Sequence, residues 1–114
     1  MTTVTITLRN ETSDVYALNH QSMLHGEWTQ PPPESIGANS VTTIIAASDG
    51  AGVQGSAYYG NRDNLSFTFN FDNPVIGSNS YSASATPTPQ YECTSNGGGG
   101  TNSSVTYVVE LSPN

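Results

Sequence analysis

The sequence predicts an all-β fold: a single-domain antiparallel β-sandwich of about seven to nine short strands spanning residues 1–114. Three observations support this prediction. Apolar and polar residues alternate with a period of two in several segments, which is typical of strands with one buried face. Turn-forming residues separate these segments at short intervals, and no segment carries a helical apolar stripe of ten residues or more. Short strands at this spacing are typical of sandwiches and small barrels.

Three segments alternate most regularly. Val4, Ile6 and Leu8 alternate with threonines in a strand expected at 2–9, and similar patterns predict strands at 65–71 and 104–111. Shorter strands rich in Val, Ile, Thr, Tyr or Ser are expected at 15–18, 41–47, 53–59, 78–84 and 89–93. Gly, Pro, Asn and Asp supply the turns between them.

Two segments depart from this pattern. Residues 29–39 contain three consecutive prolines, which predict a stiff extended connection that crosses between the sheets. Residues 94–104 are rich in Gly, Ser and Asn, and we expect a flexible loop at the tip of a hairpin that joins the last two strands.

The charge balance excludes one class of partner. The chain has two Lys+Arg residues, nine Asp+Glu residues and a net charge of -7. With only Arg9 and Arg62 as cationic side chains, it lacks the charge needed to neutralise a run of phosphates, so we expect no nucleic-acid binding. The same shortage argues against electrostatic docking on anionic lipid, and any membrane contact would depend on aromatic and uncharged polar groups.

No apolar run approaches the roughly 20 residues that span a bilayer, so no transmembrane segment is expected. Met1 leads directly into a strand pattern with no basic and apolar leader. We therefore expect a soluble protein that is cytoplasmic or leaves the cell by a leaderless route, with peripheral membrane association if it binds lipid. The single cysteine, Cys93, excludes an intramolecular disulfide and a Cys-ligated zinc site.

The motifs that resemble catalytic or cofactor sites have simpler explanations. Residues 50–55 match G-x-G-x-x-G, but a strand follows where a dinucleotide site needs a helix, so we expect a glycine-rich β-turn. His20 and His25 show no nucleophile-elbow pattern around them and no helical spacing for a metal. Cys93 has no neighbouring cation to activate it. Calcium ligation and turn hydrogen bonding are alternative roles for Asn61, Asp63, Asn64 and Asp72, and turn hydrogen bonding is the simpler explanation. We expect no enzyme activity, no cofactor and no metal.

The aromatic residues are numerous for so polar a chain. Phe67, Phe69 and Phe71 are expected in the core. Trp28 precedes a proline turn and is expected at an end of the sandwich. Adjacent strand residues face opposite ways, so one ring of the Tyr58–Tyr59 pair must point outward. Exposed Trp and Tyr suit a lipid headgroup or a sugar, and core packing remains the alternative for Trp28 and the outward tyrosine.

The order of these segments resembles the aegerolysin-type family, small acidic β-sandwich proteins that include fungal haemolysin-like and bacterial insecticidal members. VTITLRNET is similar to the family's first strand, LHGEW to its second element, and GAGVQGSAYY to its glycine block. FNFDNPVIGSNSYS at 69–82 is the most distinctive match. The chain departs from the family pattern at Phe71, where a Trp is expected, at Val75, where a ring is frequent, and at Glu27, where a Lys is common.

The resemblance implies a sandwich like that of actinoporins and binding of membrane lipid, often with a larger pore-forming partner. We expect a sphingolipid or related headgroup to bind at one end of the sandwich. This surface is expected to include the Asp72–Asn79 loop. The residues expected to contribute are Trp28, Tyr58, Tyr59, Phe71, Asp72, Asn73, Pro74, Asn79 and Tyr81. The chain would then be the recognition component of a cytolytic or insecticidal pair. Two alternatives remain open: a carbohydrate-binding, lectin-like module, and a structural or developmental protein with no small ligand.

Overall fold

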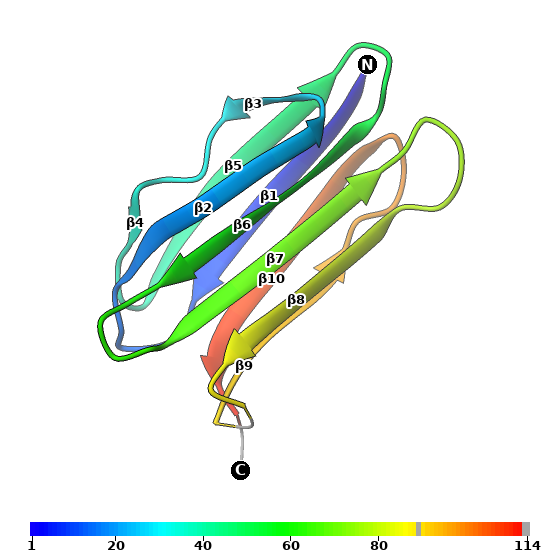
Figure 1. Ribbon diagram of the computed structural model, residues 1–114. Helices are drawn as coiled ribbons and strands as arrows, with labels where there is room; N and C mark the ends of the chain where they lie inside the picture. Colours follow the sequence, from blue (N-terminus) through cyan, green and yellow to red (C-terminus); the bar gives the residue numbers. More distant parts are fainter. Residues whose placement is uncertain (89, 113–114) are drawn as a thin grey trace.

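A computed structural model describes residues 1–88 and 90–112, and in these ranges the chain forms ten strands (Figure 1). The strands are β1 (Thr2–Asn10), β2 (Tyr16–His25), β3 (Glu27–Gln30), β4 (Ser35–Ile36), β5 (Ser40–Ser48), β6 (Val53–Gly60), β7 (Ser66–Asn73), β8 (Ser80–Thr86), β9 (Tyr91–Gly97) and β10 (Asn102–Leu111).

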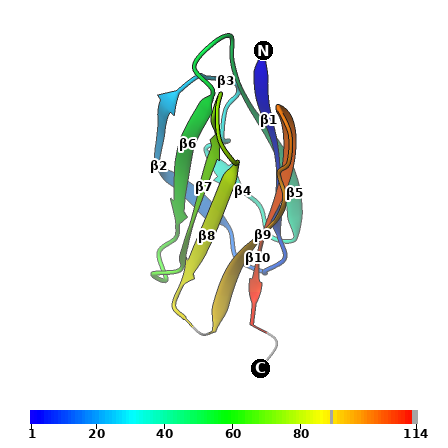
Figure 2. The same cartoon turned by 90° about the vertical axis from the view of Figure 1, so that its right-hand side faces the viewer.

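The strands form two five-stranded sheets that face each other (Figure 2). The order in sheet A is β3-β5-β1-β10-β9, and the order in sheet B is β4-β2-β6-β7-β8. Neighbouring strands are antiparallel except for β1 and β10, which pair in parallel. The predicted all-β sandwich is confirmed, with ten strands in the described residues where about seven to nine were expected.

The additional strands lie at sheet edges. β3 and β4 have four and two residues, too few for a period-two pattern to be visible in the sequence. They also show that the predicted crossing is correct, because the prolines at 31–33 connect β3 in sheet A to β4 in sheet B.

Two predicted boundaries were wrong. β2 continues well beyond the expected 15–18, because its second half lies at the edge of sheet B beyond β4 and its residues do not alternate between buried and exposed. β9 and β10 extend into the predicted loop at 94–104 and leave only 98–101 as the connection, since ladder hydrogen bonds do not require apolar side chains. The hairpin itself is confirmed. Residue 89, the expected start of the 89–93 strand, lies outside the described residues.

The core consists of the inward-facing residues of both sheets, and aromatic rings contribute much of its volume. Phe69 of β7 packs against Tyr107 of β10 with ring centroids 4.8 Å apart. Phe67 packs edge-on against Tyr16 at 4.9 Å and stacks on Tyr59 at 5.2 Å. The expected burial of the three β7 phenylalanines is therefore confirmed.

Two buried tyrosines donate hydrogen bonds from their hydroxyl groups to backbone carbonyls. Tyr107 donates a hydrogen bond to the Asn70 carbonyl, and Tyr59 donates one of 2.7 Å to the Pro33 carbonyl. Burial raises the pKa of both phenols. It also raises the pKa of the Cys93 thiol to about 12, so the cysteine is a core residue and not a nucleophile at neutral pH.

Replacing a central core ring tests the packing. Phe69→Ala is expected to lower the free energy of unfolding by about 3–5 kcal/mol, because the cavity left beside Tyr107 adds to the lost burial. Ser84→Ala, on the exposed face of β8, should change it by less than about 0.5 kcal/mol. Urea unfolding followed by circular dichroism measures both changes, and equal effects would contradict this core assignment.

The buried thiol gives a second prediction. At pH 8 Cys93 should react with iodoacetamide only as fast as the chain unfolds, and rapidly in urea. Because the unfolded chain forms the thiolate near pH 9, the Cys93 contribution to stability is intact below that pH. It should be lost as the pH rises from about 9 toward about 12. Fast, stoichiometric labelling of the folded protein would show that the thiol is accessible.

Candidate functional site

The loops of one end of the sandwich gather around the β7–β8 connection, and we call this the loop end (Figure 1). It contains the β5–β6 turn at 49–52, the β7–β8 loop at 74–79 and the β9–β10 loop at 98–101. Within the 74–79 loop, Val75 is 61% exposed and Ile76 is 89% exposed. Two adjacent branched apolar side chains therefore project into solvent at the tip of this loop.

The 74–79 loop is held at both of its ends by asparagine side chains. Asn73, buried at the end of β7, places its Nδ2 within 3.0–3.3 Å of the carbonyls of Thr3, Gly100 and Thr101 and the hydroxyl of Ser103. Asn79 donates from Nδ2 to the carbonyls of Gly98 at 2.7 Å and Gly100 at 2.9 Å. These contacts fix the loop against the glycine connection, and the two loops line an open hollow of about 550 Å³.

Tyr81 forms one wall of this hollow. Its hydroxyl lies 2.8 Å from the Ser103 Oγ. Its ring occupies the space where any side chain at Gly98 would stand, and Gly98 also has a left-handed φ of 101°. Glycine is therefore required at this position both by the backbone and by the ring.

The charges at the loop end are acidic. Glu27 and Asp49 line a second hollow there, and Asp72 lies just before the 74–79 loop. Both arginines lie toward the opposite end, where Arg9 forms an ion pair of 3.3 Å with Glu11. Neither arginine is therefore placed to receive a phosphate at the loop end.

Three residues that the sequence assigned to ligand contact are buried. Tyr59, Phe71 and Asn73 have almost no exposed surface. The first two fill the core, and Asn73 is engaged with backbone carbonyls as described above. The assignment of ligand contact to these side chains is therefore corrected: they support the surface from within. Pro74, Asn79 and Tyr81 do lie together around the hollow at the loop end.

Trp28 lies at the open edge of the sandwich, next to Glu27 of the loop end. It belongs to β3 in sheet A, yet its ring packs edge-on against Phe71 of sheet B at 5.6 Å. Its Nε1 donates a hydrogen bond of 2.6 Å to the Oε1 of Gln21 on β2. The half-buried indole thus joins the two sheets, which favours the core-packing alternative.

Tyr58 is the outward-facing ring of the tyrosine pair and is 40% exposed, which confirms the alternation argument. It lies on the outer face of sheet B, paired with His20 and Thr68. Tyr58 is four residues from Gln54, about 13 Å along the strand, so the structure does not bring it to the loop end with residues 74–79.

The structure also shows the conformation of the glycine-rich motif and of the Asn and Asp residues considered as calcium ligands. Residues 50–55 form a turn that leads into strand β6, as expected for a glycine-rich β-turn. The Asn61 Oδ1 accepts hydrogen bonds from the backbone N–H groups of Asp63 and Leu65, a turn contact at the end remote from Asp72. In residues 1–88 and 90–112, no three His, Cys, Asp or Glu side chains cluster as metal ligands, and no helix is long and apolar enough to cross a membrane.

The sequence placed the Asp72–Asn79 loop on the binding surface but did not single out Val75 and Ile76 as its contact residues. A pair of apolar residues within a turn is too short to show periodicity, so neither strand nor core burial could be inferred from it. The available signal was the position of this pair between two turn formers, Pro74 and Gly77. Apolar side chains at the tip of a turn lie far from the core and tend to remain exposed.

The role of Asn73 can be tested directly. Asn73→Ala should lower the free energy of unfolding by about 1–3 kcal/mol, because it removes the hydrogen bonds that join the end of β7 to backbone carbonyls of β1 and the β9–β10 loop. Asn79→Ala should lower the free energy of unfolding by a smaller amount, since the hydrogen bonds of Asn79 are partly exposed to solvent. Urea unfolding checks both variants, and a neutral Asn73→Ala would contradict the structural role given to this side chain.

Comparison with known proteins bears on the fold. No protein-family model matches the chain. An uncharacterized protein of Dictyostelium discoideum is 38% identical over 80 residues, which are 67% of this chain. The chain spans only 7% of the length of that curated relative.

Solved structures match almost the whole chain. The lipid binding protein Nakanori superposes with a TM-score of 0.80 at 17% identity, over 96% of this chain and 71% of its own. RahU protein superposes with a TM-score of 0.78 at 17% identity, over 99% of this chain and 97% of its own. IP-1A from Alcaligenes faecalis superposes with a TM-score of 0.74 at 18% identity, over 96% of this chain and 91% of its own. At these identities the superpositions show a shared fold. The resemblance seen in the sequence is therefore confirmed for the fold: the chain has an aegerolysin-type β-sandwich.

Proposed function

We propose that this protein binds lipid membranes through its loop end, without catalysing a reaction, by inserting Val75 and Ile76 between the headgroups. The exposure of these two adjacent side chains is the observation that carries the proposal. The asparagine contacts at both ends of the loop support it, because a loop that is already ordered loses little conformational entropy on binding. The similarity of the fold to a lipid binding protein agrees with this proposal.

The expected strength of this contact follows from burial. Removing a Val or Ile side chain from water contributes about 1.5–3 kcal/mol, so each residue changes affinity roughly tenfold to a hundredfold. Two side chains alone give weak and reversible attachment, less than one acyl chain provides. Polar contacts to headgroups must supply the remainder, and Pro74, Asn79 and Tyr81 line a hollow beside the inserted residues.

The charge distribution restricts the lipid class. A net charge of -7 and an acidic loop end disfavour anionic phospholipids. We therefore propose a zwitterionic or uncharged headgroup, with a sphingolipid as the first class to test. Binding should depend little on salt, because no ion pair with the headgroup is formed.

A role as the recognition component of a cytolytic or insecticidal pair is a further part of the proposal and rests on the family resemblance. A single short loop with two inserted side chains does not explain a pore. The protein alone is therefore expected to bind vesicles without releasing a trapped dye, and any release should require a larger partner.

Vesicle pelleting with sphingomyelin and sterol tests the loop end. Ile76→Asp and Val75→Asp should each weaken binding by at least about tenfold, because a carboxylate opposes entry into the headgroup layer. Val41→Asp is the matched control, since Val41 is an equally exposed valine, at 56%, on the outer face of sheet A. The control should bind like the parent protein.

The outcomes separate the alternatives. Raising NaCl from about 0.05 M to about 0.5 M should shift the parent Kd by less than about twofold. Equal binding by all three variants would place the lipid contact elsewhere. No binding by the folded parent, across sphingolipid, sterol and phospholipid mixtures, would favour a structural protein with no lipid ligand.

A further inference from the structure

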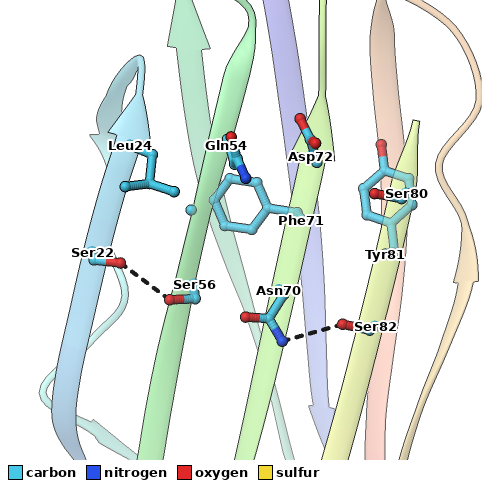
Figure 3. A pocket seen from close by; sticks show the side chains of 11 residues that line it. Ser22, Leu24, Gln54, Ser56, Asn70, Phe71, Asp72, Ser80, Tyr81 and Ser82 are labelled. Atoms are coloured by element: carbon cyan, nitrogen blue, oxygen red, sulfur yellow. Dashed lines mark hydrogen bonds between the residues drawn. The ribbon is translucent and has the colours of Figure 1, made fainter. Parts of the chain in front are cut away.

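The outer face of sheet B carries a second surface that the loop end does not use. A cavity of about 230 Å³ opens on this face, across the ends of β2, β6, β7 and β8 that lie nearest the loop end (Figure 3). It is smaller than the roughly 300–1,000 Å³ of pockets that enclose drug-sized ligands, so its occupant is about the size of one small ring.

Two rows of polar side chains cross the sheet in this cavity. The row nearer the loop end consists of Gln54, Asp72 and Ser80, which pair in register across three strands. Directly opposed side chains on a sheet lie about 4.5–5.5 Å apart at Cβ, so the three groups converge on one small area. The second row contains Ser22, Ser56, Asn70 and Ser82.

The second row is already organised by its own hydrogen bonds. Ser22 and Ser56 share one of 3.2 Å, and Asn70 donates one of 3.2 Å to Ser82 (Figure 3). In the row nearer the loop end, the side chains of Gln54, Asp72 and Ser80 form no hydrogen bond with any other residue in the described part of the chain. Their donors and acceptors are therefore free for a ligand.

Apolar groups complete the site. Leu24, which is 67% exposed, extends over the cavity from the edge strand β2 (Figure 3). Gly55 and Phe71 lie beneath the cavity, where the Phe71 ring is buried on the inner side of the sheet, 2.9 Å from the position of a Cβ at Gly55. The cavity thus combines one carboxylate, two amides and several hydroxyls with an apolar wall.

From this arrangement we infer that the outer face of sheet B binds a neutral hexose unit, with the Asp72 carboxylate accepting hydrogen bonds from two neighbouring sugar hydroxyls. Gln54 and Asn70 can both donate to and accept from further hydroxyls, and Leu24 faces the C–H surface of the ring. A phosphate is disfavoured, because Asp72 would repel it and no cationic side chain lines the cavity.

The hexose has two sources with the same chemistry, a soluble glycan or the headgroup of a glycolipid. The cavity suits both, because Asp72 and Ser80 directly flank the 74–79 loop. This inference does not depend on membrane binding by Val75 and Ile76, and the experiment below separates the two.

Two probes identify the source. The first is the set of methyl glycosides of glucose, galactose and mannose, titrated while the amide resonances of residues 54–56, 70–72 and 80–82 are followed by NMR. The second is phosphatidylcholine vesicles that contain monohexosylceramide, compared with vesicles that contain ceramide alone. Response to the glycosides indicates a soluble glycan, and preference for hexosylceramide without such a response indicates a glycolipid headgroup.

Asp72→Asn should weaken the response to the recognised probe by at least about tenfold, since it replaces a charged acceptor with a neutral one. Gln54→Ala is a second variant whose side chain supports no other residue described here. Asp63→Asn, the same change at the opposite end of the sandwich, is the matched control and should respond like the parent.

Ile76→Asp should still bind a methyl glycoside that the parent binds, so loss of membrane insertion is distinguished from loss of the sugar site. The inference is overturned if neither the glycosides nor hexosylceramide produce a response that depends on Asp72. It is also overturned if Asp72→Asn weakens binding to ceramide and hexosylceramide vesicles equally, because the hexose would then not be recognised.

Discussion

Strand β7 connects the two sheets through Phe69, Phe71 and Asn73, and both proposed surfaces lie on or next to this part of the strand. Phe69 packs against Tyr107 of sheet A, and the Tyr107 hydroxyl returns a hydrogen bond to the β7 backbone. Phe71 contacts Trp28 across the open edge. At the end of the strand, Asn73 contacts carbonyls of β1 and the β9–β10 loop. A chain with few aliphatic residues thus joins its sheets through rings and one buried amide.

The position of β7 also explains why both proposed surfaces are well ordered. Asp72 on the outer face and Val75 at the loop tip lie within two residues of Asn73, whose side chain is fixed on backbone carbonyls. Binding groups carried by a rigid strand end keep their geometry when no ligand is present, which lowers the entropic cost of recognition. Stability and function therefore depend on the same strand, although different residues serve them.

The sequence predicted the sandwich because its long strands alternate cleanly, and the three β7 phenylalanines were placed correctly for that reason. The short edge strands β3 and β4 were missed, since backbone pairing forms them without a side-chain pattern. At the site, alternation showed that one ring of the tyrosine pair faces outward, but only three-dimensional packing distinguished Tyr58 from Tyr59. The burial of Asn73 and the cross-sheet contact of Trp28 depend on residues distant in the chain, so local spacing gave no signal for either.

Depth-dependent fluorescence quenching is the most direct test of the account, because it reports which part of the sandwich enters the bilayer. With Trp28 replaced by Phe, Ile76→Trp places a single indole at the loop tip and Val41→Trp places one on the outer face of sheet A. Vesicles with lipids brominated along the acyl chains should quench the Ile76→Trp emission and shift it to shorter wavelength, and should leave the Val41→Trp emission unchanged. Quenching of Val41→Trp, with Ile76→Trp unaffected in vesicles that the protein binds, would contradict insertion through the loop end.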